Sequence, residues 1–380
     1  MEAHYFPDEP LTRWDAESLD RFLIWGEQLG MSDVHILPGG PFWIRLHGAW
    51  LPATRRRVAG NEIMELVNAT YRSANASAQV QGGQDLDYAH EIRLDRVQRK
   101  RFRCNATACR DGWQLGASIV MRTIPALPPP LEDLDVEPAI MEAAFPVNGL
   151  VLVTGVMGTG KSTLLSSMLR YIRENQPRNI LTYESPIEFD LMNIPNPKGP
   201  LVQASIPEHL VDFVRAPRNS ARRAADVVLI GESRDPETLR GMIEMAEIGV
   251  AAYSTVHTRG VAETPTRIIN VFPSDSQNQI ASTLLASLRL IIQQRLVPKV
   301  GGGRIALREY LAFDVALREQ LYREPITNLI PAIQMMVREC GQPLVVDARR
   351  KLEAGLIFEK DYRAIVHEQE TSEEAIKHVA

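Results

Sequence analysis

Cysteine, aromatic residues and long apolar runs are all scarce in this sequence. Three cysteines occur in 380 residues, and aromatic residues make up 6% of the chain. Cys104, Cys109 and Cys340 lack the paired spacing of a zinc site or a disulfide framework, which favours a reducing compartment. No apolar stretch approaches the roughly 18 to 20 residues of a membrane-spanning helix, and residues 1–10 do not resemble a secretion signal. We therefore expect a soluble, cytosolic protein.

The chain also lacks an excess of charge of either sign. Its 42 basic and 47 acidic residues give a formal net charge of -5. This balance provides no general electrostatic field for binding nucleic acid or an anionic membrane, so any such contact must be local. A hydrophobic content of 45% is enough for a sizeable core, and the length predicts two ordinary domains.

The first third of the chain is predicted to form a small domain of helix and strands, which we place at residues 1–122. Apolar residues follow a helical period between residues 15 and 29. Alternating, strand-like stretches follow at 33–36, 42–46, 102–108 and 114–121. A proline-rich stretch then ends in Pro128-Pro129-Pro130, which can continue neither a helix nor a central strand. We expect an extended linker at 123–130 and a second domain at 131–380.

The second domain is predicted to be α/β. Its strands are continuous apolar runs, and they lie at 150–153, 180–183, 227–230 and 250–253. Such strands, separated by helical stretches, indicate a parallel sheet covered on both faces. Apolar residues then recur at helical spacing from Ile280 through Leu288 to Ile292, and again from Ile330 to Val337. We therefore expect a helical C-terminal portion from about residue 274.

A glycine-rich segment after the first of these strands carries the clearest chemistry. It lies between residues 150–153 and a helical pattern that begins at Thr163. Glycines in this pattern let successive backbone amides and a helix N-terminus bind phosphate, while Lys161 reaches the outer phosphates and the Ser162 hydroxyl takes a Mg²⁺ position. The alternative is a chance glycine-rich turn, which would not require a strand before it and a helix after it. We predict an ATPase whose nucleotide-binding residues are Gly155, Val156, Met157, Gly158, Thr159, Gly160, Lys161, Ser162 and Thr163.

Acidic residues at the ends of two other strands are candidates for the metal and for the attacking water. Glu232 follows the strand at 227–230. That end of a parallel sheet lies beside the phosphate loop, so we expect Glu232 to bind Mg²⁺ or its water together with Ser162. Glu184 and Glu188 follow the strand at 180–183; either is a possible general base, and Glu184 is preferred. The alternative for each is an ordinary surface carboxylate.

The phosphate loop is the first of four short segments that occur in order along the chain. The others are Thr182–Phe189, Gly231–Thr238 and Ser254–Thr258, the last of which contains His257. A lone histidine is more often structural than catalytic, but the set of four is specific. It resembles the corresponding segments of the secretion-superfamily hexameric ATPases, the PilT-like motors of type IV pilus retraction and type IV secretion.

This resemblance implies a fold, an assembly and further site residues. The fold is a RecA-like core with a smaller N-terminal α+β (PAS-like) domain and C-terminal helices. The assembly is a homohexamer at the inner-membrane components of a secretion or conjugation machine. The implied catalytic residues are Glu184, Glu232 and His257 with the first-domain arginines Arg101, Arg103 and Arg122, which would contact phosphate. Arg110 is a further candidate for phosphate contact. A solvated basic strand face is the alternative for these arginines. Arg295 matches a family segment without a role that we can derive.

Details within the family favour secretion over pilus retraction. Ser185 stands where the retraction motors usually carry an aspartate, and residues 325–330 match their C-terminal signature only in part. Residues 206–210 and 218–223 look more like the DotB and TraJ ATPases of type IVB secretion and plasmid conjugation. We therefore expect a cytoplasmic motor, peripheral to the inner membrane, that hydrolyses ATP with Mg²⁺ and does not bind nucleic acid directly.

Other functions remain as alternatives. A pilus retraction motor belongs to the same family, and a nucleic-acid motor also uses a phosphate loop. The acidic net charge counts against the nucleic-acid motor, and stimulation of hydrolysis by DNA would distinguish it. A nucleotide-dependent scaffold would bind ATP without turnover, and a phosphate-release assay would identify it.

Overall fold

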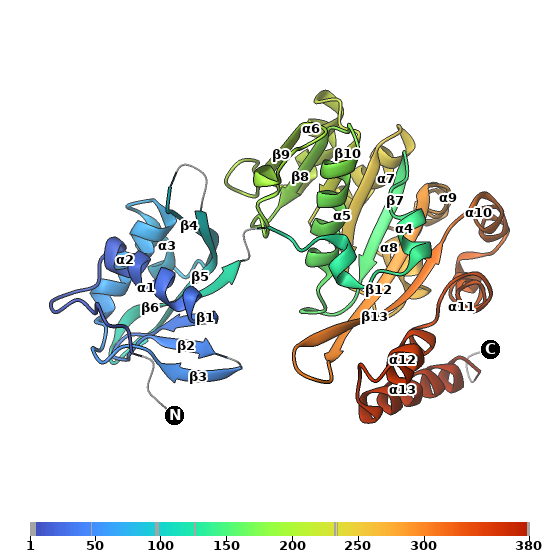
Figure 1. The fold of residues 1–380 in the computed structure, drawn as a ribbon. Helices are drawn as coiled ribbons and strands as arrows, with labels where there is room; N and C mark the ends of the chain where they lie inside the picture. The colour runs from blue at the N-terminus through green and yellow to red at the C-terminus, as the bar shows by residue number, and fades with distance from the viewer. Residues whose placement is uncertain are drawn as a thin grey trace. The chain divides into compact units, whose positions relative to one another are not determined.

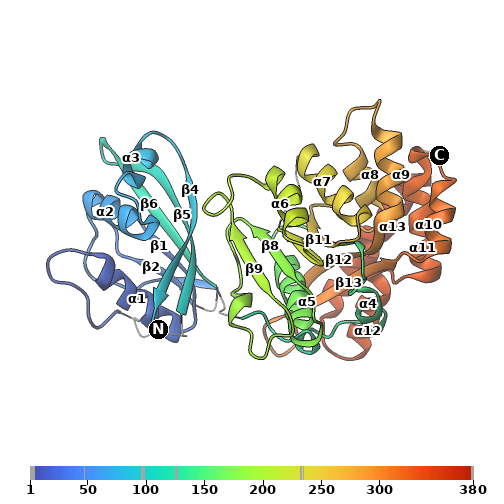
Figure 2. The ribbon, with the colours of Figure 1, turned by 90° about the horizontal axis from the view of Figure 1, so that it is seen from above.

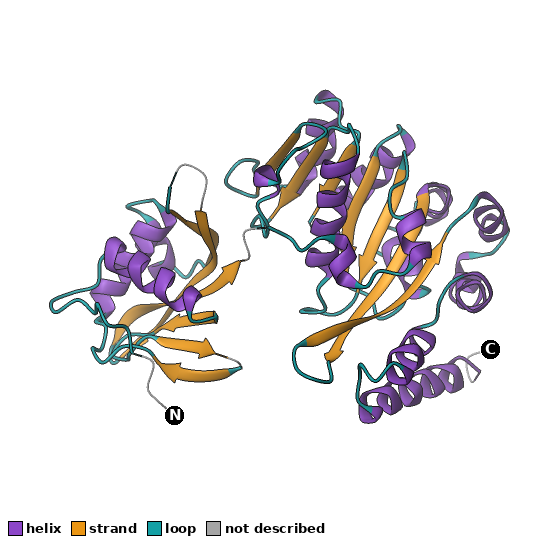
Figure 3. Ribbon diagram, in the orientation of Figure 1, coloured by secondary structure: helices purple, strands orange, loops and turns teal. Residues whose placement is uncertain are grey.

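The computed structural model describes residues 5–377 except 47, 96–98, 125–126, 232 and 234, with side chains described up to residue 369. The chain forms two compact units (Figures 1 and 3). The first unit contains Met1–Leu127 and Ser185–Asn193, and the second contains Pro128–Glu184 and Ile194–Ala380. The break at Leu127 falls inside the expected linker. The return of Ser185–Asn193 to the first unit had no counterpart in the sequence analysis.

The first unit is an antiparallel sheet with helices packed against it. Its strands are β1 (Met31–Ile36), β2 (Trp43–Leu46), β3 (Ala49–Pro52), β4 (Leu86–Arg93), β5 (Arg99–Asp111) and β6 (Gln114–Ile124). They follow the order β3-β2-β1-β6-β5-β4, and every neighbouring pair is antiparallel. Helices α1 (Ala16–Gln28), α2 (Gly60–Tyr71) and α3 (Ala76–Gln81) lie against one face of the sheet (Figure 1).

Alternation along the strands explains this arrangement. On β5, Phe102, Cys104 and Ala106 are buried, whereas the residues between them are partly exposed. Residues two apart on a strand point to the same face, so one face of β5 joins the core and the other carries polar side chains. The buried face packs with the helices around aromatic residues that include Trp14 and Phe22.

The second unit contains a mostly parallel sheet. Its strands are β7 (Gly149–Thr154), β8 (Ile180–Glu184), β9 (Leu201–Ser205), β10 (Val227–Ile230), β11 (Ala251–Val256), β12 (Leu288–Pro298) and β13 (Arg304–Ala312). They follow the order β13-β12-β7-β11-β10-β8-β9, and only the pairing of β12 with β13 is antiparallel. All residues of β7, β8, β10 and β11 are buried, as a sheet covered on both faces requires.

Helices cover both faces of this sheet, with α5 (Lys161–Asn175) on one side and α7 (Pro236–Glu247) on the other (Figure 2). The remaining helices are α4 (Pro138–Ala143), α6 (Ala216–Arg222), α8 (Glu263–Ile269), α9 (Gln277–Ser287), α10 (Val315–Tyr322), α11 (Leu329–Cys340), α12 (Leu344–Glu353) and α13 (Glu359–Lys377). Short 3-10 turns occur at Leu131–Leu134, Leu191–Asn193, Phe213–Arg215 and Ile326–Asn328. No helix within the described residues has the length and apolar character that crossing a bilayer requires.

The sequence prediction for the C-terminal portion is wrong in one segment. The helical spacing from Ile280 to Ile292 predicted one helix, but α9 ends at Ser287 and Leu288 begins β12. Leu288, Leu290, Ile291 and Ile292 are all fully buried. In a strand that is buried on both faces, nearly every residue is apolar, so apolar residues also occur three and four positions apart, as in a helix. The spacing of apolar residues therefore could not distinguish a helix from a strand in this segment. The helix predicted at residues 330–337 is confirmed by α11.

Candidate nucleotide-binding site

The glycine-rich segment connects β7 directly to α5. Gly155, Gly158 and Gly160 have φ angles of 140°, 80° and 82°, in the region that side chains disfavour. Gly155 also has no room for a side chain, because a Cβ there would lie 2.5 Å from the carbonyl oxygen of Gln294. Gly160 is the N-cap residue of α5, so the free amides of the helix's first turn follow the loop. The geometry is therefore that of an anion-binding turn.

Lys161 contributes the positive charge of this turn. Its side chain is buried, and its Nζ donates to the carbonyl oxygens of Gly155 and Val156, each at 2.9 Å. The Thr159 hydroxyl donates to the same Val156 carbonyl at 3.0 Å. Ser162 and Thr163 follow in the first turn of α5 and are partly exposed. The ammonium group thus lies within the loop that its neighbours form.

Parallel pairing brings the other candidate segments to the same edge of the sheet. Thr154, the last residue of β7, pairs with Val256 of β11 on one side and with Gln293 of β12 on the other. His257 follows Val256 directly, so it lies at the strand end next to the phosphate loop. Its side chain is exposed, and it lines a pocket of about 240 Å³ together with Ser233 and Arg267.

Glu184 ends β8 and is buried at the same edge. Its Oε1 accepts from the Thr182 hydroxyl at 2.7 Å and from Nε2 of Gln203 at 3.2 Å. Both contacts orient the carboxyl group. Burial raises the pKa of the preceding Tyr183 to about 12, since the phenolate would have to leave water. Glu188 lies in the segment grouped with the first unit, where its Oε1 is 3.4 Å from Nη1 of Arg103.

Glu232 lies outside the described residues, but its neighbours are fixed. The Gly231 amide donates to the Tyr183 carbonyl at 2.8 Å, and the Gly231 carbonyl accepts from the Thr255 hydroxyl at 2.7 Å. The Ser233 and Ser254 hydroxyls are 3.0 Å apart and buried. The Gly231 backbone is therefore held between β8 and β11, and the Ser233 side chain contacts Ser254 of β11.

Three of the four candidate arginines of the first unit, Arg101, Arg103 and Arg122, share one face of its sheet. Arg101 and Arg103 alternate with buried residues on β5, and Arg122 of β6 is the cross-strand partner of Arg103. Arg122 Nε donates to Asp33 Oδ1 at 2.8 Å, with the side chain 66% exposed. Arg101 Nε is buried, 3.8 Å from a Glu91 oxygen and without a hydrogen bond. Arg110 lies farther along β5, where it donates to the Gly112 carbonyl and stacks on Trp113.

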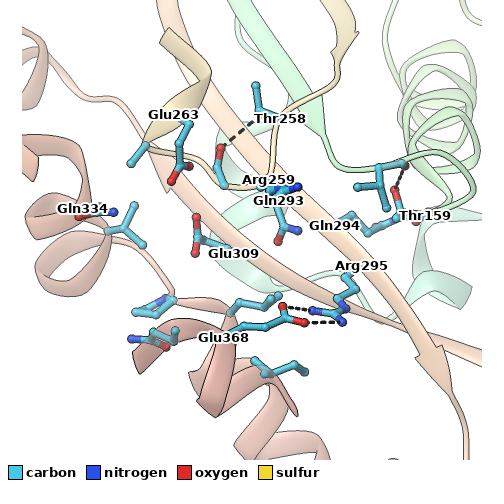
Figure 4. A pocket seen from close by; sticks show the side chains of 18 of the residues that line it. Thr159, Thr258, Arg259, Glu263, Gln293, Gln294, Arg295, Glu309, Gln334 and Glu368 are labelled. Carbon is cyan, nitrogen blue, oxygen red and sulfur yellow. Dashed lines mark hydrogen bonds and ion pairs between the residues drawn. The ribbon is translucent and has the colours of Figure 1, made fainter. Parts of the chain in front are cut away.

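A pocket of about 700 Å³ adjoins the phosphate loop within the second unit (Figure 4). Val156 and Thr159 form part of its wall. Burial raises the pKa of Glu309 above its ordinary value, the Glu263 carboxylate raises it further, and the Val261 amide, which donates to Glu309 at 2.8 Å, lowers it. The predicted helical residue Arg295 belongs to β12 and forms an ion pair with Glu368 at 2.6 Å.

Two residues in contact with this site were not identified from the sequence. Gln294 Nε2 donates to the Thr159 carbonyl at 2.7 Å, and Arg308 Nε donates to Gln294 Oε1 at 2.9 Å. Both are almost fully buried, at 3% and 1% exposure. The only signal was two consecutive glutamines after the apolar run at 290–292, which suggests a buried polar contact without identifying its partner.

Comparison with known proteins identifies the family. The pattern of the family described as "Type II/IV secretion system protein" matches residues 100–379. The type IV pilus retraction ATPase PilT of Pseudomonas aeruginosa is 32% identical over 321 residues, which cover 83% of this chain and 88% of PilT.

Solved structures give the same result for the fold. The X-ray structure of the Legionella pneumophila ATPase DotB superposes with a TM-score of 0.83 at 39% identity, covering 97% of this chain and all of that one. The crystal structure of the retraction motor PilT with bound ADP gives a TM-score of 0.78 at 28% identity, covering 91% of this chain and 96% of that one. A mixed α/β fold with an N-terminal unit and a RecA-like core is thereby confirmed, and with it the predicted ATPase activity. The chain belongs to the type II/IV secretion system family and is an ATP hydrolase.

Proposed function

We propose that this ATP hydrolase is a motor of a type IV secretion or plasmid conjugation system, with a role like that of DotB. The observation that carries the proposal is the match to the Legionella ATPase, which extends over 97% of this chain and all of that one at 39% identity. The agreement includes both units, so it is not confined to the phosphate loop that many unrelated ATPases share.

The proposed chemistry assigns a role to each group at the strand ends. The amides from Gly155 to Ser162 and the Lys161 ammonium bind the phosphates of ATP, which replace the loop carbonyls as partners of Lys161. Glu184 orients and deprotonates the attacking water, and His257 contacts the outer phosphate. Their support is the common edge of the sheet formed by β7, β8, β10 and β11.

A Mg²⁺ ion fits the donors available beside the loop. The Ser162 hydroxyl in the first turn of α5 would hold it, and Glu232 is assigned to it from the sequence. Hydroxyl and carboxylate oxygens are ligands that Mg²⁺ prefers. When bound, the ion would neutralise charge on the β- and γ-phosphates. Within the described residues, no group of three or more histidine, cysteine or acidic side chains forms a metal site independent of nucleotide.

The first unit is proposed to complete the site by supplying arginines. Arg101, Arg103 and Arg122 share one sheet face, and their charge would stabilise the negative charge that develops during phosphoryl transfer. Because the two units are separately compact and joined by a linker, opening and closing about that linker would couple hydrolysis to movement. We further propose a cytoplasmic homohexamer that docks on inner-membrane components of its machine and does not bind nucleic acid directly.

Gene deletion with complementation tests this function. In the native host, loss of the chain should abolish plasmid transfer or protein translocation and leave twitching motility intact. The wild-type gene should restore transfer, and Lys161→Ala should not, although the variant accumulates to the same level. Mass photometry with ATP should give a particle of six 42.5 kDa chains. Normal transfer in the deletion strain would rule out the proposal.

Pilus retraction is the second candidate, and the 32% identity with PilT over 83% of this chain favours it. The same deletion strain distinguishes the two functions. A retraction motor predicts loss of twitching with surface pili retained, and unchanged plasmid or protein transfer.

A further inference from the structure

The hydrogen bonds behind the phosphate loop form a continuous connection to the short turn that directly follows the linker. It begins at the Thr159 carbonyl, which accepts from Gln294 Nε2 at 2.7 Å. Figure 4 shows Gln294 reaching toward Thr159 from β12. Gln294 Oε1 in turn accepts from Arg308 Nε at 2.9 Å, across the antiparallel pair of β12 and β13. Gln294 therefore uses both ends of its amide.

Arg308 extends this connection to the segment where the chain enters the second unit. Its Nη2 donates to the Leu134 carbonyl and its Nη1 to the Asp135 carbonyl, both at 2.8 Å. Its Nη1 is also 3.3 Å from a Glu137 oxygen. Leu131–Leu134 is a short 3-10 turn directly after the three prolines, and Asp135 follows it with a φ angle of 47°. One guanidinium group thus holds the carbonyls that end this turn.

The surroundings of Arg308 make these contacts difficult to replace. Arg308 and Glu137 are 1% and 3% exposed, and Asp347, which accepts from the Arg308 amide at 2.9 Å, is fully buried. Lys351 Nζ lies 3.0 Å from the same Asp347. A buried polar group without a partner costs free energy, so loss of one contact is not compensated by water.

A second contact ties α5 to the last residues of the linker. Arg170 Nη1 donates to the Pro128 carbonyl at 2.7 Å. Arg170 is a residue of α5, the helix that begins at Lys161. Carbonyls on both sides of the 3-10 turn are therefore bonded to the phosphate-binding element, by Arg170 directly and by Arg308 through Gln294.

We propose that Gln294 and Arg308 are positioning residues of the phosphate loop, which fix its backbone for ATP and connect it to the turn at Leu131–Leu134 that follows the linker. This inference rests on phosphate binding by residues 155–162. Gln294 touches the loop twice, because its carbonyl also fills the space that a Cβ of Gly155 would need. The hydrogen bond from Gln294 to the Thr159 carbonyl fixes the orientation of the peptide group between Thr159 and Gly160. Because a peptide group is planar, it also fixes the direction of the Gly160 amide in the loop.

Substitutions at Gln294 isolate the loop from the rest of the connection. Gln294→Leu removes both hydrogen bonds at similar volume. Gln294→Glu keeps an acceptor for Arg308 but loses the donor to Thr159. We expect both variants to raise KM for ATP about tenfold, because an unpaired buried carbonyl lets the loop leave its binding conformation. With saturating ATP, kcat should stay within about twofold of the parent, since ground and transition states lose the same binding.

Matched variants separate positioning from general damage. Arg304→Met, an exposed arginine on the same strand β13, should leave KM unchanged. Arg308→Met should raise KM as Gln294→Leu does, and should also speed amide hydrogen exchange at residues 133–135, which Gln294→Leu should not. Arg308→Lys should restore part of the exchange protection, because its ammonium group can still donate to a carbonyl. The restoration should be incomplete, because an ammonium group reaches fewer of the carbonyls than a guanidinium group does. If Arg308→Met does not fold, the two Gln294 variants decide.

The outcomes distinguish this inference from the site on which it rests. Parent KM in Gln294→Leu, or recovery of parent KM in Gln294→Glu, would overturn the positioning role. Lys161→Ala is measured in parallel. Full activity in Lys161→Ala would reject the phosphate site itself, whereas its loss together with an unchanged Gln294→Leu would reject only the positioning role.

Discussion

In the six-stranded sheet, the candidate functional side chains lie on a face of the strands, whereas in the seven-stranded sheet they lie at the strand ends or directly after them. On β5 the arginines Arg101 and Arg103 alternate with buried residues, but on β7 all six residues are buried. An antiparallel sheet covered on one side leaves the other face for polar groups. A parallel sheet covered on both sides leaves only its edges.

In the proposed mechanism, this difference decides what each sheet would contribute to hydrolysis. Backbone groups bind at the edge of the parallel sheet, where Gly155, Gly158 and Gly160 turn the chain with positive φ angles. Side chains act on the face of the antiparallel sheet, where Arg103 and Arg122 are cross-strand partners. In the proposed mechanism, phosphate would be held by a turn of the backbone in the first case and by long, flexible cations in the second.

Lys161→Ala tests the edge of the parallel sheet with the largest expected effect. We expect ATP hydrolysis to fall by about 10³-fold or more, because the ammonium that faces the outer phosphates is lost at the point where charge develops. Phosphate release measures this, and circular dichroism checks that the variant is folded. Lys198→Ala, at an exposed lysine of the same unit, serves as the control and should keep the parent rate. Parent-level hydrolysis by Lys161→Ala would place the chemistry elsewhere.

The same contrast explains which parts the sequence could predict. The phosphate loop follows a local rule, because glycine is favoured where φ is positive and the backbone is closely approached, and the strand and helix beside it have clear patterns. The strand β12 was mistaken for helix, because burial of both faces leaves no period to read. Sequence patterns describe elements best when one side of the element is exposed.

Contacts between distant segments were beyond the reach of the sequence. Thr159, Gln294 and Arg308 meet at one point although they are separated by up to 149 positions, and no local pattern marks such a pair. The return of Ser185–Asn193 to the first unit is also a tertiary effect. By contrast, the edge location of Glu184 and His257 follows from parallel strands and could be predicted.

Core substitutions test the difference between a strand buried on both faces and a strand buried on one face, and they should have the next largest effect. Ile291→Ala and Ile292→Ala remove adjacent, fully buried side chains from opposite faces of β12, and each should cost about 2–5 kcal/mol of unfolding free energy. On β5, Phe102→Ala should cost about 3–5 kcal/mol, whereas the adjacent Arg103→Ala should change it by less than about 0.5 kcal/mol. Urea unfolding measures each value. Equal losses at Phe102 and Arg103 would contradict the one-sided burial of β5.

Arginine substitutions on the first unit test whether its polar face takes part in hydrolysis. We expect Arg103→Ala and Arg122→Ala each to lower kcat by about 10²-fold, because each would remove a cation that stabilises the transition state. The urea midpoint of Arg103→Ala should stay close to that of the parent, since Arg103 is 41% exposed. Arg122→Ala should lower the midpoint modestly, because it leaves the buried Asp33 carboxylate without its guanidinium partner. Arg93→Ala, at an exposed position on β4, is the control. Unchanged turnover in both variants would leave the face as a solvated surface.

Substitutions of helix N-caps have the smallest expected effect, and they compare the stability of the two units directly. Asp15 Oδ1 accepts from the Ser18 amide at 2.9 Å at the start of α1, and Asp235 Oδ1 accepts from the Thr238 amide at 2.8 Å at the start of α7. Each substitution by alanine should cost about 1 kcal/mol of unfolding free energy, because a helix N-terminus loses its acceptor. Urea unfolding should therefore not distinguish Asp15→Ala from Asp235→Ala.

The turnover of the two variants should differ, because α7 begins next to the proposed site and α1 does not. Asp235 is three residues after Glu232 in the chain, and the intervening Ser233 is held by Ser254. Release of the first turn of α7 should loosen this segment and lower kcat by a few-fold, whereas Asp15→Ala should leave kcat at the parent value, since α1 packs within the first unit. Equal kcat values in the two variants would show that the segment after β10 keeps its geometry without the cap. The edge of the parallel sheet would then be fixed by its strands alone.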